Sequence, residues 1–438
     1  MTAGFATEVD RALAVASAMP EGGLFHEKSW RVSPRAFPVS PRLADELDKL
    51  GYRIQLFVRA CNLLYRLSVD GKQPSWIARL LDAGKPPELV ALSREKRFRD
   101  HMPEVLRPDL ILTADGFAIA ELDNVPGGIG LTAWLSRTYS AMGEDIVGGP
   151  DGMLEGFASI LPGGDIVVSD EAATYRPEME WLAAELNLRH PESRWCVLND
   201  QAQDWQPRVY RFFELFDLPN VRAARVLQER SLSGEIRVTP PWKPALEEKL
   251  WFALFWLKPL REFWRRELSE RQFFALRKVI PYSWIVDPAP LPPHAVLPRL
   301  DLHSWDELAK ASQKERELVL KVSGFSDRAW GSRGVTVGSD VSQAQWREEL
   351  RVAVEEFGKH PRLLQEFRHS AVFEHPVLSR DSDAIETMRA RIRLCPYYFV
   401  EEGKARLRGA LATLVPPDKK LIHGMSESVL IPAAYAPG

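Results

Sequence analysis

Cysteine is scarce in this chain. Its 438 residues include only Cys61, Cys196 and Cys395, which lie far apart. Three widely spaced thiols cannot build the disulfide framework of a small secreted domain, and no Cys-x-x-Cys pair occurs. The sequence therefore predicts a protein of a reducing compartment, and we expect it in the cytoplasm.

Long apolar runs are also missing. The most apolar stretch, LWFALFWL at residues 250–257, is followed by Lys258. Eight residues are too few to cross a bilayer, which takes about 20. The first twenty residues carry acids early and lack the basic and apolar regions of a signal peptide. We expect no membrane partner.

An excess of one charge is lacking too. Lys and Arg number 57 against 60 Asp and Glu, which gives a net charge of -3. Nucleic-acid binders usually show a basic excess, so we do not expect a nucleic acid as a partner of this chain. The chain has no Walker A sequence, no Gly-x-Gly-x-x-Gly after a strand, no Gly-x-Ser-x-Gly and no closely spaced histidine pair. These absences argue against P-loop, dinucleotide-binding, serine-hydrolase and zinc sites.

The length favours several subdomains. A Gly-rich break lies near 143–165 and a proline cluster at 288–293. Between them, strands at 166–168 and 194–198 alternate with helices at 177–188 and 207–216, which predicts a small α/β subdomain. Upstream, apolar residues at steps of three and four over 43–64 predict a long helix. Downstream, we predict a strand at 318–322, a helix capped by Ser342 and Gln345, and a hairpin that turns at 401–404.

The stretch RPDLILTADGFAIAELDNVPGG, residues 107–128, carries the strongest chemical signal. Ala114, Asp115 and Gly116 read as a three-residue turn of a β-hairpin, with Thr113 paired to Phe117. Asp109 then lies opposite Glu121, and Arg107 opposite Asp123.

Alternation places these four charged side chains on one face of the hairpin. The other face carries the apolar residues Leu110, Leu112, Ala118, Ala120 and Leu122. Carboxylates within about 5 Å of one another must be neutralised. Arg107 offsets one of them, and a hard cation such as Mg²⁺ would offset the rest, with Asn124 as a further oxygen ligand. The alternative is a solvated acidic hairpin with a surface ion pair.

A second group of residues has phosphate-binding character. The predicted strand LVLKV, with Lys321, runs into the loop SGFSDRAWGSRG at 323–334. Backbone N–H groups of such a loop can approach phosphate oxygens closely. The loop residues that we single out are Ser323, Gly324, Gly331, Ser332 and Gly334. A plain surface loop is the competing interpretation.

Three further features add to this group. Lys278 is a second candidate cation for phosphates, or else a solvated helix lysine. Gln365, Glu366 and Phe367 end a strand and could bind an adenine edge. Arg389, Arg391 and Arg393 alternate along one strand, where they would bind anions or guard an exposed sheet edge.

Together these segments resemble the ATP-grasp ligases. In their order along the chain, they are similar to the circularly permuted branch that includes glutathionylspermidine synthetase. That family pairs an Arg-x-Asp strand with a Glu-x-Asn strand, and Arg107-Pro108-Asp109 and Glu121-Leu122-Asp123 stand at the matching spacing. Asp123 replaces the family's asparagine, and Asn124 follows it, so the choice between them stays open. The resemblance spans roughly 100–130 and 275–430 and lacks an amidase half.

The resemblance implies an α/β (α+β) chain with a circularly permuted ATP-grasp fold. Residues 1–149 would hold the N-terminal helices and the metal-binding hairpin. Residues 150–232 would form an inserted substrate-binding subdomain, and 233–438 the nucleotide-binding segments.

The implied activity is an ATP-dependent ligation of a carboxylate to an amine or thiol through an acyl phosphate, with Mg²⁺. Asp109, Glu121 and Asp123 or Asn124 would hold the metal. Arg107 and Arg391 would be catalytic, and Lys278, Lys321, the loop residues and Gln365–Phe367 would bind ATP. The acid and amine, small molecules or peptides, are not named by any motif, nor is the oligomeric state predicted. A catalytically silent ATP-grasp-like scaffold is the alternative.

Overall fold

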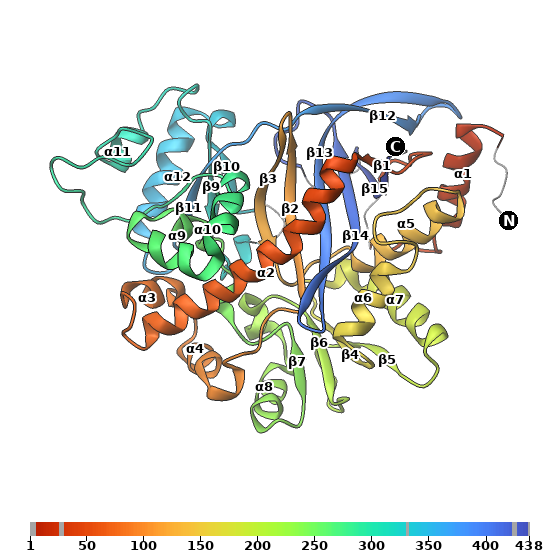
Figure 1. Ribbon diagram of the computed structural model, residues 1–438, viewed down its shortest axis with the longest axis horizontal. Helices are drawn as coiled ribbons and strands as arrows, with labels where there is room; N and C mark the ends of the chain where they lie inside the picture. Colours follow the sequence, from red (N-terminus) through yellow and green to blue (C-terminus); the bar gives the residue numbers. More distant parts are fainter. Residues whose placement is uncertain (1–5, 26–29, 330–332, 423–426, 437–438) are drawn as a thin grey trace. The chain divides into compact units, whose positions relative to one another are not determined.

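Helices and strands mix throughout the computed structural model, which describes residues 6–25, 30–329, 333–422 and 427–436 (Figure 1). This agrees with the predicted α+β class. The chain divides into two compact units, each built from separate stretches of sequence. Unit 1 comprises Met1–Leu56, Asp100–Trp242 and His369–Gly438, and unit 2 comprises Phe57–Arg99 and Lys243–Arg368. The three consecutive domains expected from the sequence stay a prediction.

The main sheet of unit 1 has seven strands in the order β1-β15-β14-β13-β2-β3, with β12 also paired to β13. All neighbours are antiparallel except β1 and β15. Consecutive hairpins build most of it, which explains the antiparallel pairing. Its strands are β1 Phe37–Val39, β2 Val105–Thr113, β3 Gly116–Asp123, β12 Val372–Leu378, β13 Ile385–Glu401, β14 Lys404–Val415 and β15 Val429–Tyr435.

The hairpin predicted to turn at 401–404 is confirmed by the pairing of β13 with β14, and its turn lies at Glu402 and Gly403, both at positive φ. The idea that the arginine strand guards a sheet edge is wrong. β13 pairs with β14 along one side, and with β12 and then β2 along the other.

The second sheet of unit 1 is parallel, with the order β5-β4-β6-β7. Its strands are β4 Gly164–Val168, β5 Trp195–Asn199, β6 Arg208–Phe212 and β7 Arg237–Thr239. The helix predicted over 207–216 is wrong, because that stretch contains β6, which pairs with β4 and β7. Its Val209, Tyr210 and Phe212 are fully buried there, as suits a strand within a sheet.

The helices of unit 1 connect these strands, and α5 and α6 pack against β13, β14 and β15. The helices of this unit are α1 Glu8–Ala18, α5 Ile129–Ala141, α6 Gly152–Ile160, α7 Arg176–Arg189 and α8 Ala224–Ser233. The predicted helix at 177–188 is confirmed as α7.

Unit 2 contains a four-stranded antiparallel sheet with the order β10-β9-β11-β8. The predicted strand at 318–322 is confirmed as β9. The strands are β8 Ser283–Ile285, β9 Leu318–Val322, β10 Val335–Val337 and β11 Arg362–Glu366. The helices are α3 Trp76–Asp82, α4 Pro87–Arg94, α9 Trp251–Trp256, α10 Arg261–Val279, α11 Trp305–Leu308 and α12 Gln343–Glu355.

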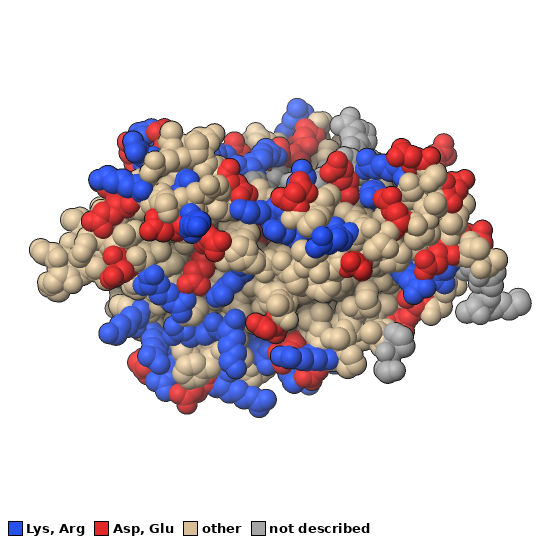
Figure 2. Space-filling model, turned by 90° about the horizontal axis from the view of Figure 1, so that it is seen from above, with Lys and Arg blue, Asp and Glu red and all other residues tan. Residues whose placement is uncertain are grey.

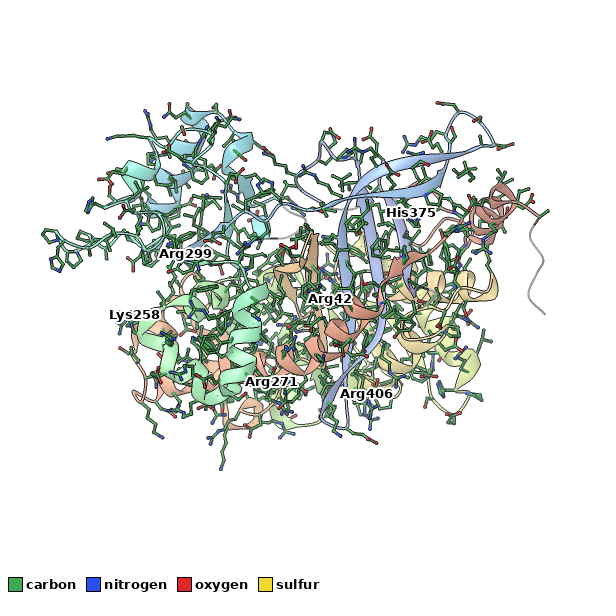
Figure 3. The ribbon with its side chains drawn as sticks, turned by 45° about the horizontal axis from the view of Figure 1, so that its top comes forward. Arg42, Lys258, Arg271, Arg299, His375 and Arg406 are labelled. Carbon is green, nitrogen blue, oxygen red and sulfur yellow. The ribbon has the colours of Figure 1, made fainter. Side chains whose placement is uncertain are left out.

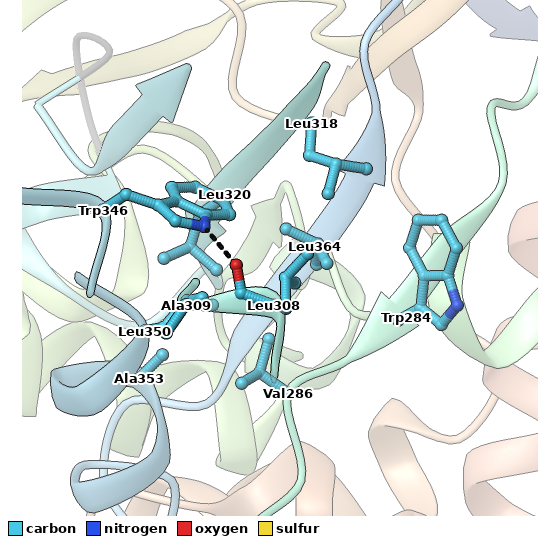
Figure 4. Packing of buried hydrophobic residues seen from close by; sticks show 10 residues of the cluster. All are labelled: Trp284, Val286, Leu308, Ala309, Leu318, Leu320, Trp346, Leu350, Ala353 and Leu364. Carbon is cyan, nitrogen blue, oxygen red and sulfur yellow. Dashed lines mark hydrogen bonds between the residues drawn. The ribbon is translucent and has the colours of Figure 1, made fainter. Parts of the chain in front are cut away.

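A buried cluster joins this sheet to α11 and α12 (Figure 4). Trp346 of α12 is fully buried, and its indole Nε1 donates to the carbonyl oxygen of Leu308 at 3.1 Å. Burying an aromatic side chain of this size with its polar atom satisfied stabilises the unit by a few kcal/mol.

The predicted long helix is confirmed as α2, which spans Pro41–Val69. Its Leu47, Leu50 and Ile54 belong to the core of unit 1, whereas Phe57 and Leu64 belong to unit 2. The helix thus runs from one unit into the other.

Charges of both signs intersperse over the face shown in Figure 2, with Lys and Arg gathered toward its lower left. In the part of the chain that the structure describes, no helix is both long enough and apolar enough to cross a membrane.

Candidate functional site

The β2–β3 hairpin has the charged register that the sequence predicts. Asp109 lies directly opposite Glu121, and Arg107 opposite Asp123. The predicted turn is wrong in detail, because Thr113 pairs with Gly116 and leaves a two-residue turn. A β-bulge between Asp109 and Leu110 then inserts one residue into β3 and restores the register.

The bulge also changes the apolar face. Leu112 lies opposite Phe117 and Leu110 opposite Ile119, so these four residues share a face. Ala118 lies opposite Ile111, on the same face as Asp109. The assignment of Ala118 to the apolar face is therefore wrong. The residue inserted at the bulge shifts the pairing by one position, so the residues of β3 between the turn and the bulge lie on the face opposite to the one predicted.

Arg107 is the centre of a partly buried ion-pair network. Its Nε donates to Asp109 Oδ1 at 3.0 Å, its Nη2 to Asp123 Oδ2 at 2.8 Å and its Nη1 to the Gly127 carbonyl at 3.0 Å. Arg393 of β13 donates from Nη1 to the other oxygen of Asp109, also at 3.0 Å. Two arginines thus neutralise two of the three carboxylates.

The acidities of the two aspartates differ for this reason. Burial raises the pKa of Asp109, but the attraction of Arg107 and Arg393 outweighs it and holds the pKa below its ordinary value. Burial dominates at Asp123 and raises its pKa in spite of Arg107. The Asp123 Oδ1 atom accepts the N–H of Val125 at 2.8 Å.

Glu121 is half-buried, and Asn124 is buried with 3% of its surface exposed. Across the described ranges, no three His, Cys, Asp or Glu side chains come together closely enough to hold a metal ion. The structure leaves the choice between Asp123 and Asn124 as metal ligand open.

Arg393 is a site residue that the sequence reasoning missed as an individual. Arg391, the predicted catalytic arginine, lies on β13 between Val372 and Val415, whereas Arg393 lies beside Ile111 of β2 and reaches Asp109. Alternation marks both arginines equally. Only the pairing of β13 with β2 separates them.

Glu178 of α7 is a second missed residue. It is fully buried and accepts the N–H groups of Gly128 at 2.7 Å and Leu131 at 2.9 Å, at the N-terminus of α5. Burial raises the pKa of this carboxyl to about 7. The only hint in the sequence is the glycine pair Gly127-Gly128 ahead of a helix, because free N–H groups at a helix start attract an acceptor.

Tyr397 of β13 is the third residue of the site that the sequence reasoning missed. Its hydroxyl donates to the Gly127 carbonyl at 2.7 Å, the same oxygen that accepts from Arg107. A Cβ on Gly127 would lie 2.6 Å from the ring of Tyr175, and Gly128 has a φ of +87°. Positions 127 and 128 therefore require glycine. Arg107 and Tyr397 fix the segment after β3 through the Gly127 carbonyl.

Lys321 and Gln365, two of the residues predicted to bind ATP, meet in unit 2. Both are buried, and the Lys321 Nζ atom donates to Gln365 Oε1 at 2.9 Å. The Gln365 Nε2 atom donates to Ser283 Oγ at 3.2 Å. The pairing of β9 with β11 produces this contact, although the residues are 44 positions apart.

The loop after β9 begins on a buried carboxylate. The Ser323 hydroxyl and the Gly324 N–H, at 3.1 Å, both donate to Glu248 Oε2, and Lys85 pairs with Glu248. These two predicted phosphate donors thus have a protein acceptor. A Cβ on Gly334 would lie 2.6 Å from the Arg328 carbonyl. Gly331 and Ser332 lie outside the described residues.

The other predicted nucleotide residues occupy the end of β11 and of α10. Glu366 pairs with Arg299 at 2.7 Å, and Arg299 lies 4.3 Å from the ring centre of Tyr282. Arg299 is labelled in Figure 3. The Phe367 N–H donates to the Glu317 carbonyl at 3.0 Å. Lys278 is exposed on the last turn of α10.

No family model matches the sequence, and no curated protein matches it. Among solved structures, a glutathione synthetase-like effector from Globodera pallida in its apo form is similar over 98% of this chain and 97% of its own. The TM-score is 0.56 and the sequence identity 14%. The chain therefore shares a glutathione-synthetase-like fold over nearly its whole length.

A candidate γ-glutamylcysteine synthetase from Methylobacillus flagellatus matches more weakly. It is 13% identical, with 80% of this chain and 84% of that one covered and a TM-score of 0.38.

Proposed function

We propose that this chain is an ATP-dependent ligase, built on a circularly permuted ATP-grasp fold, that joins a carboxylate to an amine or thiol. The observation that carries the proposal is the hairpin register, which sets Asp109 opposite Glu121 and Arg107 opposite Asp123. The likeness to the Globodera pallida synthetase-like protein supports the fold. The substrates would be small molecules or peptides of the cytoplasm.

Mg²⁺ in nucleotide enzymes is usually held by one or two carboxylates together with phosphate oxygens. Glu121, which is half-buried and opposite Asp109, suits such a shared cation. Asp109 and Asp123 or Asn124 would be its other oxygen donors. When bound, Mg²⁺ would neutralise charge on the phosphates.

The proposed reaction has two steps. A substrate carboxylate oxygen attacks the γ-phosphorus of ATP, the bond to the β-phosphate oxygen breaks, and ADP leaves. The amine nitrogen then attacks the acyl phosphate, the C–O bond breaks, and phosphate leaves while the nitrogen loses a proton.

The chain's own residues would serve these steps through charge. Lys321 and Lys278 would bind phosphate oxygens, and Gln365 to Phe367 would face the adenine. Arg107, with Arg391 or Arg393, would stabilise the oxyanion that forms as the amine attacks.

One observation favours a second candidate, a catalytically silent nucleotide-binding or partner-binding scaffold. Asp109 and Asp123 are already held by Arg107, and Asp109 also by Arg393. Carboxylates neutralised in this way have less need of a cation.

Thermal unfolding with ATP, with and without Mg²⁺, tests the ligase. A ligand at a hundred times its Kd stabilises the native state by about 2.7 kcal/mol. We expect a Mg²⁺-dependent shift that Glu121→Ala and Lys321→Met each reduce. Glu374→Ala, at an exposed position of β12, is the matched control and should keep the shift.

The outcome decides between the two candidates. A full shift in Glu121→Ala, or a shift independent of Mg²⁺, would contradict the ligase and favour the scaffold. A Mg²⁺-dependent shift would be followed by a screen of acids and amines for ADP release.

A further inference from the structure

Arg391 of β13 has no counter-charge beside it. In the register of the main sheet of unit 1 it lies between Val372 of β12 and Val415 of β14, which are both apolar. Its Nε is buried without a hydrogen-bond acceptor, and its guanidinium forms no ion pair with any residue in the described part of the chain. An arginine placed in this way can bind an added anion without first losing a partner.

The neighbouring arginines on this face of β13 differ from it. Arg393, two residues on, donates from Nη1 to Asp109 Oδ2 at 3.0 Å, whereas its Nε has no acceptor among the described residues. Arg389, two residues before, is exposed and lies opposite Glu374 of β12. Within the described ranges, Arg391 is therefore the arginine of the three that has no acid bonded to it or opposite it.

Thr413 of β14 belongs to the same part of this face. It lies directly opposite Arg393 and diagonal to Arg391, at separations that long side chains can span. Its side chain is fully buried, and its hydroxyl has no hydrogen-bond partner in the residues that the structure describes. A buried hydroxyl without a partner costs free energy that a valine of the same shape would not, so a threonine at this position calls for a ligand atom.

The unsatisfied groups have matching chemistry. The guanidinium of Arg391 and the Nε of Arg393 can only donate, and the Thr413 hydroxyl can donate as well. A ligand that satisfies them together must offer acceptors, and a carboxylate offers two oxygens in one plane. A ligand can reach this place, because Arg391 is half-buried and Val372 beside it is 42% exposed.

The distance from the hairpin carboxylates limits which ligand fits. Successive residues on one face of a strand lie about 7 Å apart. Arg393, the next residue on this face after Arg391, is the one that reaches Asp109. A molecule with one carboxylate at the Arg107 network and a second carboxylate about 7 Å away can therefore use both places at once.

We propose that Arg391, Arg393 and Thr413 form a carboxylate-binding subsite, and that the acid substrate is a dicarboxylate or a short peptide whose non-reacting carboxylate binds there. The assignment to the substrate rests on the proposed ligase, whereas the binding of a carboxylate does not.

Calorimetric titration with adipate, in the presence of Mg²⁺ and a non-hydrolysable ATP analogue, tests the subsite. We expect one site in the wild-type chain. Arg391→Gln should lower the affinity at least about tenfold, because it removes a charge-assisted hydrogen bond. Arg389→Gln, at an exposed position on the same face of β13, is the matched control and should bind as the wild type does.

Thr413 is tested by two variants. Thr413→Val keeps the shape of the side chain and removes the hydroxyl, so it should weaken adipate binding about fivefold. Thr413→Ser keeps the hydroxyl and should bind like the wild type. An unchanged melting temperature shows that Thr413→Val is folded, and wild-type affinity in that variant would contradict the role of Thr413.

Three other results would overturn the proposal. The first is no adipate binding, and the second is an equal loss in Arg391→Gln and Arg389→Gln, which would show attraction to the charge of the strand alone. The third concerns the ligand: propionate, with a single carboxylate, should bind more weakly than adipate. Equal affinity for the two, or tighter binding of inorganic phosphate, would contradict the dicarboxylate.

Failure of the subsite is distinguishable from failure of the ligase. Adipate binding without a Mg²⁺-dependent thermal shift by ATP would support the subsite and contradict the ligase. A Mg²⁺-dependent shift by ATP without adipate binding would contradict the subsite alone.

Discussion

Burial decides the chemistry of several individual residues. Glu178 lies at the N-terminus of α5, where N–H groups favour its charged form, yet the loss of water outweighs them and its pKa rises to about 7. An isolated glutamate has a pKa near 4.5. The folded state therefore binds this proton more tightly than the unfolded chain does.

That difference predicts a pH dependence of stability. The contribution of Glu178 is greatest below about pH 4.5 and is lost as the pH rises to about 7, by at most about 3 kcal/mol. Glu178→Gln keeps one acceptor and removes the titration. In denaturant unfolding between pH 5 and 7.5, we expect the free energy of unfolding of the wild type to fall relative to that of Glu178→Gln. A constant difference across this range would contradict the assignment.

Burial also distinguishes the three cysteines from one another. Cys61 and Cys395 are buried, and burial raises the pKa of both thiols, that of Cys395 to about 12. The Cys395 Sγ donates to Asp109 Oδ1 at 3.4 Å. Cys196 is half-buried on β5.

A thiol-reactive dye at pH 8 should therefore modify one cysteine rapidly in the native protein and three after unfolding, because the thiolate is the reacting form. Cys196→Ser should abolish the rapid phase. A rapid phase that survives in Cys196→Ser would show that one of the buried thiols is accessible.

At the scale of elements, local signals predicted well where the contacts are local. Ser342 and Gln345 form the predicted capping box at the start of α12, with the Gln345 N–H donating to Ser342 Oγ at 3.2 Å. The contact spans three residues, so no tertiary structure is needed to specify it. The strand β6 shows the opposite case, because its pairing with β4 and β7 overrides the predicted helix.

Removal of this cap should destabilise unit 2 modestly. Ser342→Ala loses the acceptor for a helix N–H and should lower the free energy of unfolding by about 1 kcal/mol. Ser342→Asp keeps an acceptor and should remain close to the wild type. If denaturant unfolding showed an equal loss of free energy of unfolding in both variants, the loss of the capping hydrogen bond would not be the cause of the destabilisation.

At the scale of the whole molecule, the chain passes between its two units four times, and one passage lies within α2. Leu47 and Leu50 of this helix are buried in unit 1, and Phe57 and Leu64 in unit 2. Unfolding of either unit removes packing from a helix that the other requires. We therefore expect the two units to unfold together.

Two core variants test this cooperativity by calorimetry. Leu131→Ala in unit 1 should cost about 2–5 kcal/mol and Trp346→Ala in unit 2 about 3–5 kcal/mol. Each should lower a single shared transition. Leu188→Ala, at a position 78% exposed, is the control and should change little. Two resolved transitions, each moved by only one variant, would contradict the coupling.

The sequence by itself determined the local features: the long helix α2, the cap of α12, the strand β9 and the opposition of Asp109 to Glu121. Each depends on periodicity or on contacts between neighbours in the chain. The turn at Ala114 and the bulge in β3 were both missed, and the charged register held because the two errors offset each other.

Only the tertiary structure decided which distant groups meet. Arg393 reaches Asp109 across 284 residues, Lys321 reaches Gln365 across 44, and Glu178 caps the helix that follows the hairpin. Alternation says that an arginine lies on a given face of a strand, but not which strand lies beside it. Pairing between distant strands depends on packing of the whole sheet, and for that reason the network around Asp109 could not be predicted from the sequence.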